Sequence, residues 1–420
     1  MKKCLLFGLL ANLCFAGGYE FGGLGARPIG MGGAFIGLAD DWSAIYWNPA
    51  GLCSLSERGA GSYLEYASIK GKDGNSVKNA LPELFAYSWE KASFNKKDIK
   101  TSALLPSFGF WQKLSGWTLG EGLYIPNGNA IDWEDTINDG TGTAKAEYHT
   151  MLFVSVGNLS LAKEINDNLS IGCGLNLLYG KLELEAKKDY SAPPPFDYSL
   201  SSKMEGDGCG LEGVIGFLLK ASDKISIGGV LRSGSILELK GEGEGSFQSA
   251  ILPGTGSEKS KYTQRFSYPL TCGLGIAYRL TPKITITSDW ARTGWNSMEE
   301  DVDFELDTGS GTSKLLMDRD KSLNWSNTDR FRVGIEYNLN NNWTLRTGFY
   351  SDPSPVPKDG VDITKIIDVN VRFITLGASY KRNDFGIDFC YANASGKETL
   401  EGIEYEEKGT AIGISGSYKF

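Results

Sequence analysis

The chain has 420 residues, a formal net charge of −9 and an aromatic content of 12%. This length suits two or three soluble domains or one large barrel, and the acidic balance argues against a nucleic-acid partner, which needs a basic surface. A mean hydropathy of −0.22 excludes a polytopic helical membrane protein but not a β-barrel, whose strands alternate apolar and polar residues.

The first 16 residues have the composition of a secretory signal peptide. Lys2 and Lys3 precede an apolar run at residues 4–15, and small residues follow at 16–17. This run is too short to cross a bilayer as a helix, and no later segment offers ~20 consecutive apolar residues. We therefore expect the mature chain to begin near Gly17 and any membrane crossing to be made by strands.

Residues 17–57 form a Gly-rich stretch that we expect to fold as a compact unit. Gly30, Gly32 and Gly33 allow positive φ angles and close backbone approach. Near the end of the stretch, Pro49 pushes Asn48 towards an extended conformation and stops any helix before it. A compact segment ahead of a large β domain indicates a hatch, and an ordinary turn-rich subdomain is the alternative. The motif expected to hold the hatch comprises Asn48, Pro49, Ala50 and Gly51.

Residues 58–420 consist of alternating segments separated by turns rich in Gly, Asn, Asp, Ser and Pro. In the last segment, Ile412, Ile414, Tyr418 and Phe420 share one face, and small or polar residues occupy the other. A period of two with one apolar face is typical of a transmembrane β-barrel. About fourteen such segments can be counted. We predict an all-β fold, an antiparallel transmembrane barrel of about 14 strands.

The links between these segments are of two lengths. Short links at 281–283 and 340–342 are expected to be periplasmic turns. Long polar links are expected to be loops outside the cell, at 126–146, 186–208, 240–263, 297–322, 352–371 and 395–409.

Residues 25–52 read GARPIGMGGAFIGLADDWSAIYWNPAGL, and blocks at 266–269 (FSYP), 343–349 (WTLRTGF) and 352–357 (DPSPVP) continue the pattern. Together they resemble the FadL-type outer-membrane transporters of long-chain fatty acids and other hydrophobic compounds. The resemblance implies a monomeric barrel in the outer membrane, among lipid or lipopolysaccharide, with residues 17–57 as the plug. It also implies passive uptake of a hydrophobic small molecule, above all a fatty acid, through a lumenal pocket and a lateral opening.

One segment, residues 117–125, departs from the apolar alternation at Glu121, which falls on the lipid-facing side. Gly120 and Gly122 flank it, and a β-bulge or kink there would turn the carboxylate away from lipid. A glutamate in the headgroup zone is the alternative. The resembling family carries an inward kink in its third strand, through which substrate leaves sideways. The resemblance therefore implies a lateral gate at Gly120, Glu121 and Gly122.

Strand parity places Asp289, Arg332, Glu336 and Arg346 inside the barrel. A fatty acid needs an apolar slot for its tail and one or two donors for its carboxylate, which Arg supplies best. These four residues are therefore predicted to bind substrate, with Arg332 and Arg346 as the anchors. The alternative is a lumenal salt-bridge ladder that ties the hatch to the wall.

Five of the seven cysteines follow the signal peptide: Cys53, Cys173, Cys209, Cys272 and Cys390. An odd number cannot pair completely within one chain, and three of them fall in phase with outward apolar residues. We expect small packing residues here, with a Cys53–Cys390 disulfide as the weaker alternative.

The sequence offers little that is typical of an enzyme. His149 is the only histidine, and neither a nucleotide-binding loop nor a zinc-ligand set is evident. We expect no enzymatic activity, no cofactor and no metal, although Asp301, Asp303 and Glu305 leave a calcium site as an alternative. Two other functions stay open, a structural or secretion-accessory barrel and a general porin.

Overall fold

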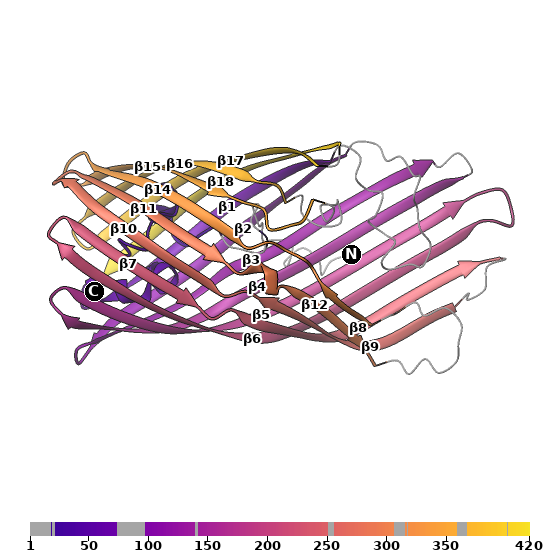
Figure 1. Ribbon diagram of the computed structural model, residues 1–420, viewed down its shortest axis with the longest axis horizontal. Coiled ribbons are helices and arrows are strands. Elements are labelled where there is room, and N and C mark those ends of the chain that lie inside the picture. The colour runs from indigo at the N-terminus through magenta and orange to yellow at the C-terminus, as the bar shows by residue number, and fades with distance from the viewer. Residues whose placement is uncertain are drawn as a thin grey trace.

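The computed structural model describes residues 18, 22–73, 97–138, 142–250, 256–305, 316, 318–358, 368–400 and 402–420. The predicted signal peptide, residues 1–16, lies outside them. The described strands form one antiparallel sheet that closes on itself, because the first strand pairs with both the second and the last. Figure 1 shows the resulting barrel from the side.

Most strands of the barrel are single segments with neighbours in chain order. They are β1 (Arg58–Asp73), β2 (Lys97–Leu114), β3 (Trp117–Asn138), β4 (Thr143–Asn166), β5 (Leu169–Ser191), β6 (Tyr198–Ser222), β15 (Trp343–Asp352), β16 (Val371–Arg382), β17 (Phe385–Leu400) and β18 (Ile403–Lys419).

Four further strands are each interrupted once, so two consecutive segments continue one another along the wall. The pairs are β7 (Ile225–Arg232) with β8 (Ser235–Ser249), β9 (Gly256–Tyr268) with β10 (Thr271–Thr281), β11 (Ile284–Thr293) with β12 (Glu299–Phe304), and β13 (Arg319–Ser322) with β14 (Thr328–Asn338). The 3-10 turn η3 (Trp295–Ser297) lies in one of these interruptions. Fourteen barrel strands result, which confirms the predicted fold class.

The strands alternate as the sequence predicts. On β18, Ile412 and Ile414 are exposed on the outer face, whereas Ala411 and Ser415 are buried on the inner face. Outward apolar side chains recur around the barrel, and small or polar side chains turn inward. No helix among the described residues is long and apolar enough to cross a membrane.

Four expected outer loops are wrong, because paired strands occupy most of them. The ranges 126–146, 186–208, 240–263 and 395–409 are largely taken up by the hairpins β3–β4, β5–β6, β8–β9 and β17–β18. Cross-strand and same-strand ion pairs cover the outer face of these hairpins, for example Lys259 with Glu242 and Glu244. A hairpin that extends outside the bilayer does not need an apolar outer face. Its sequence therefore resembles that of a loop.

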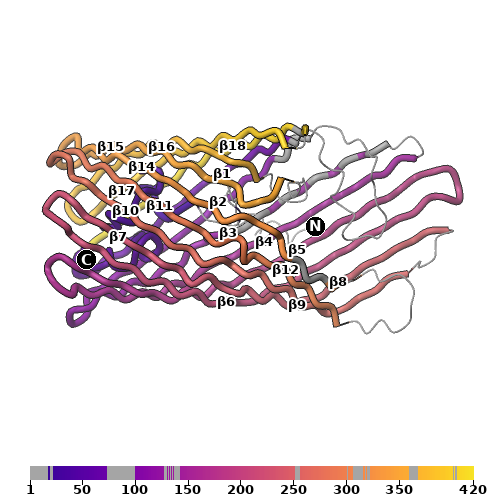
Figure 2. Tube along the Cα trace, in the orientation of Figure 1, coloured from indigo at the N-terminus to yellow at the C-terminus, as the bar shows by residue number. Residues whose placement is uncertain are grey.

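Residues 22–57, here called the N-terminal segment, lie inside the barrel at the end with the short turns (Figures 1 and 2). The segment contains the helices α1 (Ala26–Gly30), α2 (Ala44–Trp47) and η1 (Pro49–Ser54). α1 packs against β16 and β17, and η1 packs against β4, β5 and β6. The segment also makes a small core of its own, in which the Trp47 indole donates to the Leu24 carbonyl at 2.9 Å.

The predicted motif of the N-terminal segment contacts the wall directly. The Asn48 side-chain amide donates to the carbonyls of Ile36 (3.0 Å) and Phe217 (2.9 Å), the second on β6. This approach requires glycine on the wall, because a Cβ on Gly216 would lie 2.2 Å from Asn48 Oδ1. On β5, a Cβ on Gly172 would lie 2.4 Å from the Ala50 nitrogen.

All five described cysteines are free, so the Cys53–Cys390 disulfide is wrong. Asp301 and Asp303 both accept hydrogen bonds from Arg265, at 2.8 and 3.1 Å. Two of the three carboxylates considered for a calcium site are therefore paired with an arginine.

We predict that Gly216→Val loosens the N-terminal segment by displacing Asn48. Overpacking of this kind lowers the free energy of unfolding by about 1–3 kcal/mol. Limited proteolysis of the folded barrel should then cut within residues 22–57 faster than in the wild type. Gly157→Val is the matched control, because an added Cβ on this outward-facing residue meets open space among the described residues. Equal cleavage rates for the two variants would contradict the contact.

Candidate functional site

Two arginines hold Glu336 of β14 between them inside the barrel. Arg27 Nε lies 2.9 Å from Glu336 Oε2, and Arg346 Nε lies 2.7 Å from the same oxygen. Arg346 also pairs with Asp388 of β17 at 3.0 Å, and Arg27 pairs with Asp40 at 2.5 Å. Burial lowers the pKa of the Arg27 guanidinium, but the carboxylates of Asp40 and Glu336 outweigh burial and raise that pKa above its ordinary value. The cluster therefore links α1 to three wall strands.

Asp289 and Arg332 also face the N-terminal segment. Asp289 accepts hydrogen bonds from the backbone N–H groups of Phe35 (2.6 Å) and Ile36 (2.7 Å). The guanidinium carbon of Arg332 lies 5.6 Å from the centre of the Trp47 ring. All four residues predicted to bind substrate are buried and inward-facing. Their contacts match the alternative interpretation, in which ion pairs and hydrogen bonds tie the N-terminal segment to the wall. They do not support Arg346 as the group that binds a substrate carboxylate.

The wall changes between β2 and β3. β2 pairs with β1 from Lys97 to Gln112, but its described pairing with β3 runs only from Leu114–Trp117 to Phe108–Leu123. β3 meanwhile stays paired with β4 as far as Asn138. Beyond Phe108 and Leu123, the facing edges of the two strands are therefore unpaired among the described residues. We call this interval the β2–β3 gap.

A β-bulge marks the start of the β2–β3 gap. Tyr124 pairs with Val156 and Asn127 with Val154, so three steps along β3 match two along β4. Tyr124 and the next residue, Ile125, are both buried, which breaks the alternation of the strand. Unpaired strand edges are costly in a bilayer and persist only where they are covered or line a cavity. The irregularity is therefore a candidate functional feature.

The kink expected at Gly120–Gly122 is displaced, because these residues lie in a regular part of the ladder. They pair with Trp111 and Gly109 on β2. Both pack against the N-terminal segment, where a Cβ on Gly120 would lie 2.7 Å from Leu52 and one on Gly122 would lie 2.2 Å from Ile45. Glu121 remains on the outward face and exposed, as the headgroup-zone interpretation requires.

A polar ladder that the sequence reasoning missed joins the bulge to the N-terminal segment. The Tyr124 hydroxyl donates to Asn176 Oδ1 at 3.4 Å, and Asn176 donates to Glu212 at 2.5 Å. Glu212 lies 3.5 Å from Arg232, whose guanidinium carbon is 4.6 Å from the centre of the Tyr46 ring. Arg232 also donates to the Tyr46 carbonyl. These residues come from five different strands or helices. Their proximity follows from the pairing register of the barrel, which the sequence alone does not give.

Apolar side chains line the lumen next to the bulge. Val154 and Val156 on β4 are the cross-strand partners of the bulged residues. They belong to one buried cluster with inward residues of β5, β8 and β9. Its members on these four strands, here called the lumenal apolar cluster, include Leu152, Val154, Val156, Leu178, Leu182, Leu237, Leu239 and Phe266.

The chain is thus a closed fourteen-strand barrel with apolar side chains on part of its inner face and residues 22–57 inside it. Over residues 8–416 the chain matches the family described as outer membrane protein transport protein (OMPP1/FadL/TodX), and it belongs to that family. Its place is therefore the outer membrane.

Relatives with different names resemble the chain. It is 23% identical to outer membrane protein P1 of Haemophilus influenzae, covering 88% of this chain and 84% of that one. It is 24% identical to the long-chain fatty acid transport protein of Escherichia coli, covering 78% and 79%. The crystal structure of the Pseudomonas putida toluene transporter TodX superposes with a TM-score of 0.68 at 15% identity, covering 96% and 99%, which shows a common fold.

We predict that Arg346→Leu strongly destabilises the barrel, because it leaves Glu336 and Asp388 short of a buried partner. Breaking a buried pair in this way costs about 3–5 kcal/mol. Urea unfolding in lipid vesicles, followed by tryptophan fluorescence, measures the loss. Arg292→Leu is the control, since its ion pair with Asp329 is exposed and contributes at most ~1 kcal/mol. Similar losses in both variants would refute the structural role of the cluster.

Proposed function

We propose that the protein takes up hydrophobic small molecules passively across the outer membrane, with long-chain fatty acids as its substrates. Substrate enters the lumen, contacts the lumenal apolar cluster and leaves sideways through the β2–β3 gap into the bilayer. The observation that carries this proposal is the end of β2–β3 pairing at Phe108–Leu123, directly beside the bulge at Tyr124–Asn127. This route passes the acyl chain from the apolar side chains of the lumen into the hydrocarbon of the bilayer without releasing it into water at the lower end of the barrel.

We further propose that the N-terminal segment acts as a hatch that shapes the floor of the lumen. Its support is the packing of Ile45 and Leu52 against Gly120 and Gly122, just below the gap. Substrate binding shifts a hatch between two arrangements only if the substrate binds them with different affinities. A monomer surrounded by outer-membrane lipid and lipopolysaccharide is sufficient for this function.

Arg232 is our candidate for the group that binds a fatty-acid carboxylate. It lies on the ladder between Tyr124 at the bulge and Tyr46 in the N-terminal segment. Its side chain is 14% exposed, so a carboxylate bound there would gain a charge-assisted hydrogen bond away from bulk water. This assignment replaces Arg332 and Arg346, whose positions favour attachment of the hatch.

We predict that deletion of Pro126 abolishes oleate uptake. The deletion removes the extra residue of the bulge, restores the two-residue period of β3 and lets its edge pair further with β2. Cells that lack their own fatty-acid transporter, and that express the variant, should accumulate labelled oleate no faster than cells without the protein.

Pro126→Ala is the matched control for this deletion, because it keeps the residue count and therefore the bulge. It should retain most of the oleate uptake. Uptake of a small polar sugar, measured in parallel, distinguishes a hydrophobic route from a porin. Wild-type oleate uptake by a correctly assembled deletion variant would show that substrate leaves elsewhere, and sugar uptake without oleate uptake would favour a porin.

We predict that Arg232→Gln separates fatty acids from neutral hydrocarbons. A hydrogen bond to a charged group contributes about 1.5–3 kcal/mol, so the half-saturating oleate concentration should rise by roughly tenfold or more. Uptake of toluene, which has no carboxylate, should change little. The control Arg292→Gln removes an exposed arginine. Equal effects on oleate and toluene would mean that Arg232 does not bind the carboxylate.

A further inference from the structure

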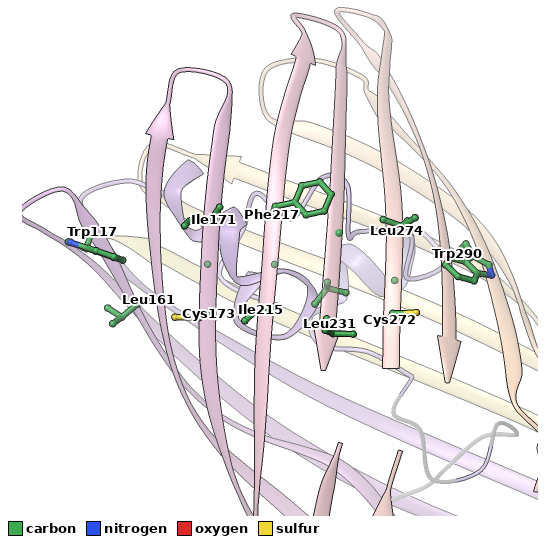
Figure 3. A pocket seen from close by; sticks show the side chains of 15 residues that line it. Trp117, Leu161, Ile171, Cys173, Ile215, Phe217, Leu231, Cys272, Leu274 and Trp290 are labelled. Atoms are coloured by element: carbon green, nitrogen blue, oxygen red, sulfur yellow. The ribbon is translucent and has the colours of Figure 1, made fainter. Parts of the chain in front are cut away.

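An apolar groove of about 700 Å³ lies on the outer wall of the barrel, away from the lumen (Figure 3). It extends from Trp117 at the start of β3 across β4, β5, β6, β7, β10 and β11 on their outward faces. Its volume falls in the range of roughly 300–1,000 Å³ that is typical of ligand sites. Its lining is almost entirely hydrocarbon, aromatic carbon and thiol.

Strand register explains why the groove exists. One row of directly paired outward residues runs Leu161–Cys173–Ile215–Leu231–Cys272. The next row runs Ile171–Phe217–Gly229–Leu274–Trp290. Bulky side chains dominate both rows, but Cys173 and Cys272 are small and leave space beside them. The Phe217 ring lies over Gly229, where an added Cβ would be only 2.3 Å from it.

The two ends of the groove differ in charge and depth. Lys163 on β4 pairs with Ile171 and so extends the second row, and its Nζ lies 5.0 Å from the centre of the Trp117 ring. Lys163 and Trp117 are close to the short turns at 167–168 and 115–116, whereas Leu274 lies far along β10 from its turn. Short turns mark the periplasmic side, and aromatic and basic side chains mark the headgroup level.

The inner side of this wall is packed. Between the two rows, the inward positions Gly172 and Gly216 contact Ala50 and Asn48 of the N-terminal segment. The groove therefore opens towards the bilayer, and its occupant comes from the membrane rather than from the lumen.

We propose that the groove binds an acyl chain of one anionic phospholipid of the periplasmic leaflet, with its phosphate at Lys163. The charged end of the groove lies at headgroup depth and the apolar end lies in the hydrocarbon region, as such a lipid requires. The chain runs beside Cys173 and Cys272, whose small side chains leave space among the bulkier ones of the two rows. The ammonium group of Lys163 supplies the complementary charge.

Native mass spectrometry of the whole protein tests this proposal. The barrel is reconstituted with dioleoylphosphatidylglycerol, transferred to mild detergent, and the retained lipid is counted. The wild type should retain one phospholipid. Cys173→Trp and Cys272→Trp fill the groove and should each weaken lipid binding by roughly tenfold, the change in Kd that about 1.4 kcal/mol of binding free energy produces.

Cys209→Trp is the matched control, since Cys209 is also an exposed outward cysteine on β6 but does not line the groove. It should retain lipid as the wild type does. Lys163→Gln should reduce retention of phosphatidylglycerol more than that of phosphatidylethanolamine, and Lys224→Gln at a periplasmic turn should not. Equal retention by Cys173→Trp and Cys209→Trp would overturn the proposal. Displacement of the phospholipid by equimolar oleate would also overturn it, because the groove would then be a site for free fatty acid.

Discussion

Close packing between the N-terminal segment and glycines on the inner wall is the constraint on which this structure depends. The Asn48 side chain reaches the Phe217 carbonyl of β6 only because Gly216 has no side chain. A barrel of fourteen strands would otherwise enclose a wide lumen. The packed segment fills its lower part and leaves the lumenal apolar cluster above it.

Electrostatics secures the same packing. Glu336 is shared by Arg27 of the segment and Arg346 of the wall, and Asp289 accepts two backbone N–H groups of the segment. Buried charges are costly unless paired, so each partner holds the other in place. The segment packs against Gly120 and Gly122 of β3, and the pairing of β3 with β2 ends one residue later at Leu123. The N-terminal segment and the β2–β3 gap therefore lie next to each other.

The sequence predicted those features that depend on local periodicity. It did not predict features that depend on how neighbouring strands pair. Alternation alone placed Ile412 outside and Arg346 inside, and the Pro49 signal located the end of α2. The bulge at Tyr124–Asn127 was missed because it is defined by the register with β4, although Pro126 marks the place. Arg232 was missed for the same reason. The hairpin β5–β6 read as a loop because its outer part carries paired charges instead of apolar residues.

Photo-crosslinking with a diazirine analogue of oleate tests the central claim, lateral passage through the β2–β3 gap, most directly. The barrel would be irradiated in liposomes during transport, and the labelled peptides would be mapped by mass spectrometry. We expect labels on β2 before Phe108 and on β3 after Leu123, competed away by unlabelled oleate. Labels confined to the outer wall or to the periplasmic face of the N-terminal segment would contradict this account, because the fatty acid would then pass by another route.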